Sequence, residues 1–133
     1  MPNKSLVKMA FVDAPAYEAA KHFGATTYRL QHRDLSGVQG FWVGLSYFLP
    51  GGGAETDSSD TEKVYVVLSG SVAVISEDDK EYELGPLDSL YIPPNAKRRI
   101  INKSKAPATM LVIATYPKQG GARRCRGSRA AKT

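Results

Sequence analysis

The stretch PGGGAETDSSDTEKVYVVLSG, residues 50–70, decides the fold of this chain. It opens with a proline and three glycines, which mark a turn, and it closes with a Ser-Gly turn after the run KVYVVL. That run is rich in β-branched and aromatic residues, as strands are. Asp57, Ser59 and Lys63 stand between the two turns. We expect a strand on each side of this stretch, with these three polar side chains presented between them.

A second stretch, residues 85–102, has the same character. It reads GPLDSLYIPPNAKRRIIN, with a short apolar strand before a Pro-Pro-Asn turn and a second strand after it. Arg98 begins the second strand, and Asn102 ends it at a turn, where we expect its amide to satisfy backbone groups. Because side chains alternate across a strand, Arg98 and Arg99 point to opposite faces. We expect Arg99 to lie in solvent.

The chain as a whole contains seven to nine short predicted strands separated by turns, which favours an all-β sandwich or barrel. We expect residues 50–53 to end the strand before them, and residues 63–76 to form a hairpin around the Ser-Gly turn. Only residues 14–23 are predicted to be helical. The remaining predicted strands cover residues 27–31, 41–49, 81–84, 89–92, 98–102 and 109–116.

The two quoted stretches resemble the two sequence motifs of the cupin superfamily. The first motif of that family presents His-x-His and then a glutamate, at the positions where this chain has Asp57, Ser59 and Lys63. The second motif presents a histidine where this chain has Arg98, and the wording EYELGPLDSLYIPPN is close to the family's usual wording. The resemblance covers residues 40–116.

This resemblance implies an all-β fold, namely a double-stranded β-helix (jelly-roll) barrel with a short N-terminal arm or helix. We expect the arm over residues 1–27, the barrel over residues 28–117 and a basic tail over residues 118–133. Cupins commonly dimerise, and the arm is long enough to cross to a partner. The resemblance therefore also predicts a homodimer.

The chemistry of metal-binding cupins does not carry over to this sequence. Such cupins hold iron, manganese, nickel or zinc with three imidazoles and a carboxylate, which are neutral or anionic donors. The lysine ammonium and the arginine guanidinium are cations without a lone pair, so Lys63 and Arg98 predict that no metal or other cofactor is bound. A metal would need at least three relocated ligands. The candidates are Glu55, Glu62 and the two histidines His22 and His32, which we otherwise expect at the surface or at an interface.

In the cupin frame, Lys63 and Arg98 point into the barrel, where two cations repel each other and lose hydration. Two interpretations follow. In the first, one of them forms a buried ion pair with Asp57 or Glu55, and the site is inert. In the second, the pairing is incomplete, and the remaining positive charge binds an anionic ligand, for which the planar guanidinium is well suited. We favour the second interpretation because perturbed charges at former ligand positions tend to mark functional sites.

The cupin frame also suggests roles for the individual residues of the cavity. Burial and a nearby guanidinium lower the pKa of a lysine, so Lys63 is a candidate general base, with Asp57 as its partner. Tyr65 shares the face of Lys63, and either hydrogen-bonds a substrate or fills the core. Ser59 is a candidate hydrogen-bonding residue of the cavity wall. Trp42 and Tyr47 lie on opposite faces of one strand, so we expect only one of them to line the cavity.

Three classes of function remain open at this point. The first is a metal-free acid–base enzyme of isomerase or lyase type, acting on a small molecule with a carboxylate or phosphate. The second is a non-catalytic module that binds or senses such a molecule. The third is a metal-dependent cupin with relocated ligands. Fold alone does not decide among them.

Composition limits the partners and the location. Six of the eighteen basic residues and none of the thirteen acidic residues lie after position 117. The rest of the chain therefore has twelve basic and thirteen acidic residues, and the net charge of +5 comes from the tail. We expect this tail to be disordered, and without interleaved aromatic residues it is not expected to bind nucleic acid. The one cysteine, Cys125, excludes an internal disulfide. No apolar run is long enough to span a membrane and no secretory signal is evident, so we expect a cytoplasmic protein.

Overall fold

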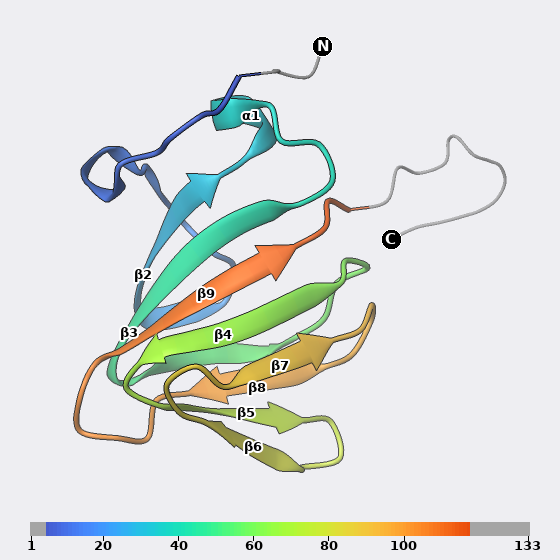
Figure 1. Cartoon of the computed structure of the whole chain (residues 1–133). Helices are drawn as coiled ribbons and strands as arrows, with labels where there is room; N and C mark the ends of the chain where they lie inside the picture. The colour runs from blue at the N-terminus through green and yellow to red at the C-terminus, as the bar shows by residue number, and fades with distance from the viewer. Residues whose placement is uncertain (1–4, 118–133) are drawn as a thin grey trace, which may run out of the picture.

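The computed structural model describes residues 5–117, which form a nearly closed antiparallel β-barrel (Figure 1). Apart from a 3-10 turn, η1 (Phe11–Asp13), and one short helix, α1 (Arg33–Ser36), the regular structure of these residues is strand. The strands are β1 (Ala16–Tyr17), β2 (His22–Gln31), β3 (Trp42–Asp57), β4 (Lys63–Ser69), β5 (Val72–Ser76), β6 (Glu81–Leu84), β7 (Ser89–Ile92), β8 (Arg98–Ile101) and β9 (Ala108–Ala114).

The long strand β3 organises the sheet. The strands run in the order β6-β5-β8-β3-β9-β4-β7, and β2 pairs with β3 and carries β1 on its other side. The first half of β3 pairs with β2 and β9, whereas its second half pairs with β8 and, at Gly53 and Ala54, still with β2. One strand therefore passes from one side of the barrel to the other, as Figure 1 shows. The predicted all-β jelly-roll barrel is confirmed.

Glycines permit this crossing. A Cβ atom on Gly52 would lie 2.2 Å from the Gly24 carbonyl oxygen, and one on Gly53 would lie 2.0 Å from the Ile100 carbonyl oxygen. Only glycine allows the backbones to approach so closely. The expectation that residues 50–53 end the strand is therefore wrong, because β3 continues through these glycines to Asp57.

The core lies between the two sides of the barrel, where alternate strand residues point inward. Phe48, Val67 and Met110 are fully buried there, on β3, β4 and β9. Along β3 the inward set contains Trp42, Ser46 and Phe48, while Tyr47 is exposed on the outer face. This alternation is the period of two that the sequence predicted.

Two local predictions are wrong. Residues 14–23 are not a helix: Ala16 and Tyr17 pair with Tyr28 and Thr27 as the short strand β1, and β2 begins at His22. Strand pairing overrides the helical propensity of this alanine-rich segment. The predicted hairpin over residues 63–76 is also absent, because β4 pairs with β7 and β9 whereas β5 pairs with β6 and β8.

Asn102 has the structural role that the sequence predicted. It is fully buried, and its Nδ2 donates hydrogen bonds to the carbonyl oxygens of Phe48 (3.2 Å) and Ala106 (2.9 Å). Its Oδ1 accepts from the amide and the hydroxyl of Ser104. Buried backbone groups need such partners, so this one amide joins the loop before β9 to β3.

Two further expectations concern the C-terminal tail and membrane-spanning segments. The basic tail over residues 118–133, with Cys125, lies outside the described residues. Over residues 5–117 no helix has the length and apolar character needed to cross a membrane.

Candidate functional site

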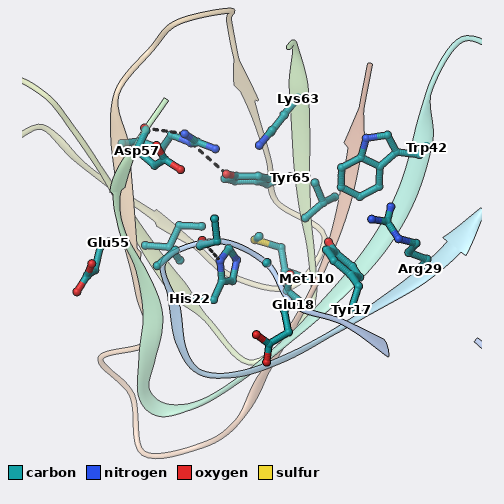
Figure 2. A pocket seen from close by; sticks show the side chains of 17 residues that line it. Tyr17, Glu18, His22, Arg29, Trp42, Glu55, Asp57, Lys63, Tyr65 and Met110 are labelled. Atoms are coloured by element: carbon teal, nitrogen blue, oxygen red, sulfur yellow. Dashed lines mark hydrogen bonds between the residues drawn. The ribbon is translucent and has the colours of Figure 1, made fainter. Parts of the chain in front are cut away.

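A cavity of about 270 Å³ opens inside the barrel, between the motif strands and the segment that joins β1 to β2 (Figure 2). In Figure 2 the labelled side chains lie around this cavity. Its polar and aromatic lining residues are Tyr17, Glu18, His22, Arg29, Trp42, Ser46, Glu55, Asp57, Lys63, Tyr65 and Arg98.

Arg98 is the best-anchored cation of the cavity. It stands opposite Asp57 in the pairing of β8 with β3. Its Nη1 donates to the backbone carbonyl oxygen of Asp57 (2.7 Å), and its Nε donates to the hydroxyl of Tyr65 (3.2 Å). Both acceptors are neutral, and within residues 5–117 no carboxylate forms an ion pair with this guanidinium. The guanidinium therefore keeps its charge and part of its hydrogen-bonding capacity.

Lys63 lies at the start of β4 and also lines the cavity. Its pKa is lowered to about 8, first by burial and then by the Arg98 guanidinium, against a smaller opposite effect of Asp57. No ion pair involves this lysine in the part of the chain that the structure describes. At neutral pH the ammonium form therefore predominates, and the free amine becomes the main form only above about pH 8.

The predicted ion pair between Asp57 and a motif cation is not formed. The Asp57 carboxylate lies 3.6 Å from the Lys21 ammonium and accepts a hydrogen bond from the Ser58 amide (2.9 Å). Lys21 lies in the segment after β1, whose residues Glu18, Ala19 and Ala20 line the cavity. The Glu55 side chain is exposed at the rim, and its backbone amide donates to the carbonyl of Lys21 (3.0 Å). Of the two expected neutralising partners, Asp57 therefore pairs with a third cation, Lys21, and Glu55 forms no ion pair within residues 5–117.

Tyr65 combines the two roles that the sequence left open. Its side chain is 3% exposed and packs in the core, while its hydroxyl accepts the hydrogen bond from Arg98. Burial raises the pKa of Tyr65, against the lowering effect of Arg98. Lys63, Tyr65 and Arg98 together form one polar surface of the cavity, which we call the motif wall. Ser59 does not belong to it, because its hydroxyl pairs with that of Thr61 (2.8 Å) away from the cavity lining.

An aromatic cluster forms another part of the lining. The Arg29 guanidinium lies 4.4 Å from the ring centroid of Tyr17 and 5.8 Å from that of Trp42, and the two rings meet edge to face at 6.2 Å. Gly44 makes room for them, since a Cβ there would lie 2.9 Å from the Trp42 ring. Trp42 is thus the residue of its strand that lines the cavity, as one of the two sequence alternatives predicted. Burial raises the pKa of Tyr17, and Arg29 opposes this.

The sequence analysis did not place His22, Tyr17, Glu18, Arg29 or Ser46 in the cavity. Of these, His22 was expected at the surface or at an interface. It pairs with the inward-facing Ala54 in the register of β2 with β3, so it points into the barrel. Its ring stacks on Phe48 at 6.0 Å between centroids, and its Nδ1 lies 2.9 Å from the carbonyl oxygen of Ala20. His32, in contrast, caps α1 and contacts Tyr116. Nothing in the local sequence separates the two histidines, because the difference arises from strand pairing.

Comparison with known proteins identifies the family of this chain. The sequence profile of the cupin domain matches residues 44–114, more than half of the chain. The chain belongs to the cupin family. The curated Beta-D-galactosidase Rv1717 of Mycobacterium tuberculosis (strain ATCC 25618 / H37Rv) is 41% identical to this cupin over 104 residues, which are 78% of this chain and 89% of that relative.

Solved structures give the same fold. The polyketide cyclase RemF from Streptomyces resistomycificus superposes on this cupin with a TM-score of 0.75 at 19% identity, covering 84% of this chain and 80% of the cyclase. An RmlC-like cupin from Shewanella frigidimarina gives a TM-score of 0.67 at 14% identity, covering 84% of this chain and 91% of the other. At these identities the likeness extends to the fold alone.

The donor set of this cupin does not fit the metal that many cupins hold. Two of the four motif positions are the cations Lys63 and Arg98, and Arg98 is already engaged with Tyr65 and the backbone of Asp57. Within residues 5–117, no three His, Cys, Asp or Glu side chains are clustered so that they could hold a metal ion. A transition metal needs at least three well-placed lone-pair donors, and the motif wall, with two cations among its three residues, does not supply such a set.

Proposed function

We propose that this cupin binds a small molecule carrying a carboxylate or phosphate inside its barrel, and acts on it by acid–base chemistry without a metal. One observation carries the proposal: Lys63 and Arg98 line the same cavity, and neither forms an ion pair within the described residues. Two unpaired cations in a partly buried site are costly. An anionic ligand would offset that cost.

The ligand class that we favour is a sugar acid or a sugar phosphate. The cavity of about 270 Å³ suits a molecule of monosaccharide size, and Trp42 and Tyr17 offer apolar ring surface to a sugar. The 41% identical relative is named as a galactosidase, which supports a carbohydrate ligand. In this arrangement Arg98 holds the anionic group, Tyr65 positions Arg98, and Lys63 exchanges a proton with the ligand.

Calorimetric titration with D-galacturonate and with galactose 6-phosphate tests the binding step. We expect Arg98→Met to weaken binding about 10- to 100-fold, because a charge-assisted hydrogen bond contributes about 1.5–3 kcal/mol. Arg99→Met is the matched control, since Arg99 is the exposed neighbour on the same strand, and it should leave binding unchanged. Equal effects of the two variants, or no binding of either anion by the wild type, would overturn the proposal.

A pH profile distinguishes an enzyme from a binding module. If Lys63 exchanges a proton during turnover, kcat/KM for the active anion should show a limb near pH 8. The limb rises if the amine accepts a proton and falls if the ammonium donates one. Lys63→Met should abolish the limb together with most of the activity. Tight binding without turnover would assign the module function and refute the catalytic part.

Elemental analysis of the purified protein tests the metal-free part. We expect far less than one equivalent of iron, manganese, nickel or zinc per chain, and binding of the anions that survives dialysis against a chelator. A transition metal near one equivalent, lost together with ligand binding on chelation, would contradict the proposal. Relocated ligands would then have to include side chains such as Glu55 and His22.

Hydrolysis of β-D-galactosides is the second candidate, favoured by the identity to the named galactosidase. Glycoside hydrolysis generally uses two carboxylates beside the scissile bond. The carboxylates that line this cavity are Glu18, Glu55 and Asp57. A chromogenic nitrophenyl β-D-galactoside tests this activity directly. If it is cleaved, replacing the two operative carboxylates by their amides should each reduce kcat by at least about 100-fold.

A further inference from the structure

The segment that joins β1 to β2 completes the cavity from the side opposite to the motif. Residues 16–22, which we call the N-terminal strap, contribute Tyr17, Glu18 and His22 to the lining. In the view of Figure 2, Tyr65 lies between His22 and Lys63. A ligand held by the motif wall therefore meets the strap on its other side.

His22 is held in a defined orientation within this strap. Its inward direction follows from its pairing with Ala54, and its ring is supported by the fully buried Phe48. Its Nδ1 lies 2.9 Å from the carbonyl oxygen of Ala20. A carbonyl only accepts hydrogen bonds, so Nδ1 carries a hydrogen and the lone pair of the neutral ring is on Nε2.

Nε2 has no hydrogen-bond partner among residues 5–117. Such a half-buried ring nitrogen beside a polar cavity is available to a ligand. We propose that His22 is a second proton-transfer group of this site, with Nε2 in contact with the bound molecule. This inference rests on the proposed function, and it identifies the group that faces the ligand from the side opposite to Lys63.

The proton balance of this arrangement is simple. Nε2 accepts a proton from a hydroxyl or an activated C–H of the ligand, which becomes an imidazolium proton. The Lys63 ammonium donates a proton to the other side of the ligand and becomes an amine. The ligand gains and loses one proton, as in an isomerisation or epimerisation, and no oxidant or other reactant is consumed. Solvent returns both groups to their starting forms.

Nuclear magnetic resonance of the ring nitrogens tests the inference, because the chain has only two histidines. We expect the neutral ring of His22 to be the Nδ1–H tautomer. Titration with D-galacturonate should shift the Nε2 resonance of His22, and saturate at the concentration found by calorimetry. The resonances of His32, which lies outside the cavity lining, should not move. A dominant Nε2–H tautomer at His22 would overturn the inference without any ligand.

Two variants complete the test. His22→Phe keeps a ring against Phe48 but removes both nitrogens, and we expect kcat to fall at least 100-fold with KM changed less than threefold. His32→Asn, which retains a residue suited to cap α1, should behave as wild type. This inference alone would be refuted if anion binding depends on Arg98 but does not shift the His22 resonance, and if His22→Phe leaves turnover unchanged. Absence of anion binding would refute the proposed function and this inference with it.

Discussion

The motif wall and the N-terminal strap face the same cavity but are held in different ways. Tyr65 of the wall is almost fully buried, and Arg98 is fixed by two hydrogen bonds and by strand pairing. The strap contains the two-residue strand β1 and the first residue of β2. Besides this strand pairing, it is tied to the barrel by the hydrogen bond from the Glu55 amide to the Lys21 carbonyl and by a solvent-accessible ion pair between Lys21 and Asp57. The wall is thus part of the folded core, while the strap is a lightly attached cover.

Because of this difference, we expect substitutions in the two regions to have different effects. Changes beside the wall should act on the stability of the whole barrel, because its residues share the core. Changes in the strap should act on the ligand and on local opening, because few buried contacts hold it.

The largest effect is expected at Asn102, on the core side of the contrast. Asn102→Ala removes an amide that joins the loop before β9 to β3, and leaves the carbonyl of Phe48 without its side-chain donor. Unsatisfied buried polar groups cost about 1–3 kcal/mol each, so we expect a loss of roughly 3 kcal/mol or more in the free energy of unfolding. Urea denaturation measures it. Ser104→Ala, which removes one donor to the same amide, should cost about 1 kcal/mol, and the reverse order would contradict this account.

A smaller effect of opposite sign is expected at Lys63. Its pKa is about 8 in the folded protein and near 10.5 in the unfolded chain, so the unfolded state binds more protons between these values. Stability therefore rises with pH from about 8 to 10.5 and is reduced below pH 8 by the buried charge. We expect Lys63→Met to be more stable than wild type at pH 7 by about 1 kcal/mol, since the ammonium retains part of its hydration.

The pH dependence provides the check on this prediction. The advantage of Lys63→Met in thermal unfolding should decrease as the pH rises from 7 to 10, whereas Arg99→Met should show no such trend. A variant less stable than wild type at pH 7 would mean that Lys63 has a favourable ionic partner. The motif wall would then resemble the strap in its electrostatics.

The sequence predicted the wall well because its determinants are local. Alternation along β4 places Lys63 and Tyr65 on one face, and alternation along β8 separates Arg98 from Arg99. The motif spacing then brings these strands to one cavity, as the register of the barrel confirms. The fold class required only turn signals and strand propensities, which are properties of short stretches of sequence.

The sequence did not predict the strap because its determinants are tertiary. Residues 14–23 have apolar residues at helical spacing, and the strands that form here instead depend on pairing with β2 and β3. The pairing of Asp57 with Lys21 joins residues far apart in the chain, so charge spacing gave no signal for it. The inward position of His22 likewise depends on its register with Ala54.

The smallest effect on global stability is expected at Lys21, where the contrast is sharpest. The chain offers a matched control, because the ion pair of Lys103 with Glu81 has similar exposure: 53% and 40%, against 51% and 43% for Lys21 and Asp57. Solvent-exposed ion pairs contribute about 0–1 kcal/mol. Lys21→Met and Lys103→Met should therefore each change the free energy of unfolding by less than about 1 kcal/mol.

The two variants should differ in local opening, because only Lys21 holds the strap. The amide of Glu55 donates to the carbonyl of Lys21, so its hydrogen exchange reports whether the strap is in place. We expect this amide to exchange several-fold faster in Lys21→Met than in Lys103→Met, and bound D-galacturonate to dissociate faster from the former. Equal exchange in both variants would show that β1 and the aromatic contacts of Tyr17 hold the strap without the ion pair. In that case the strap would unfold together with the motif wall as one cooperative unit. Local opening has a low free energy only where few other contacts break with it.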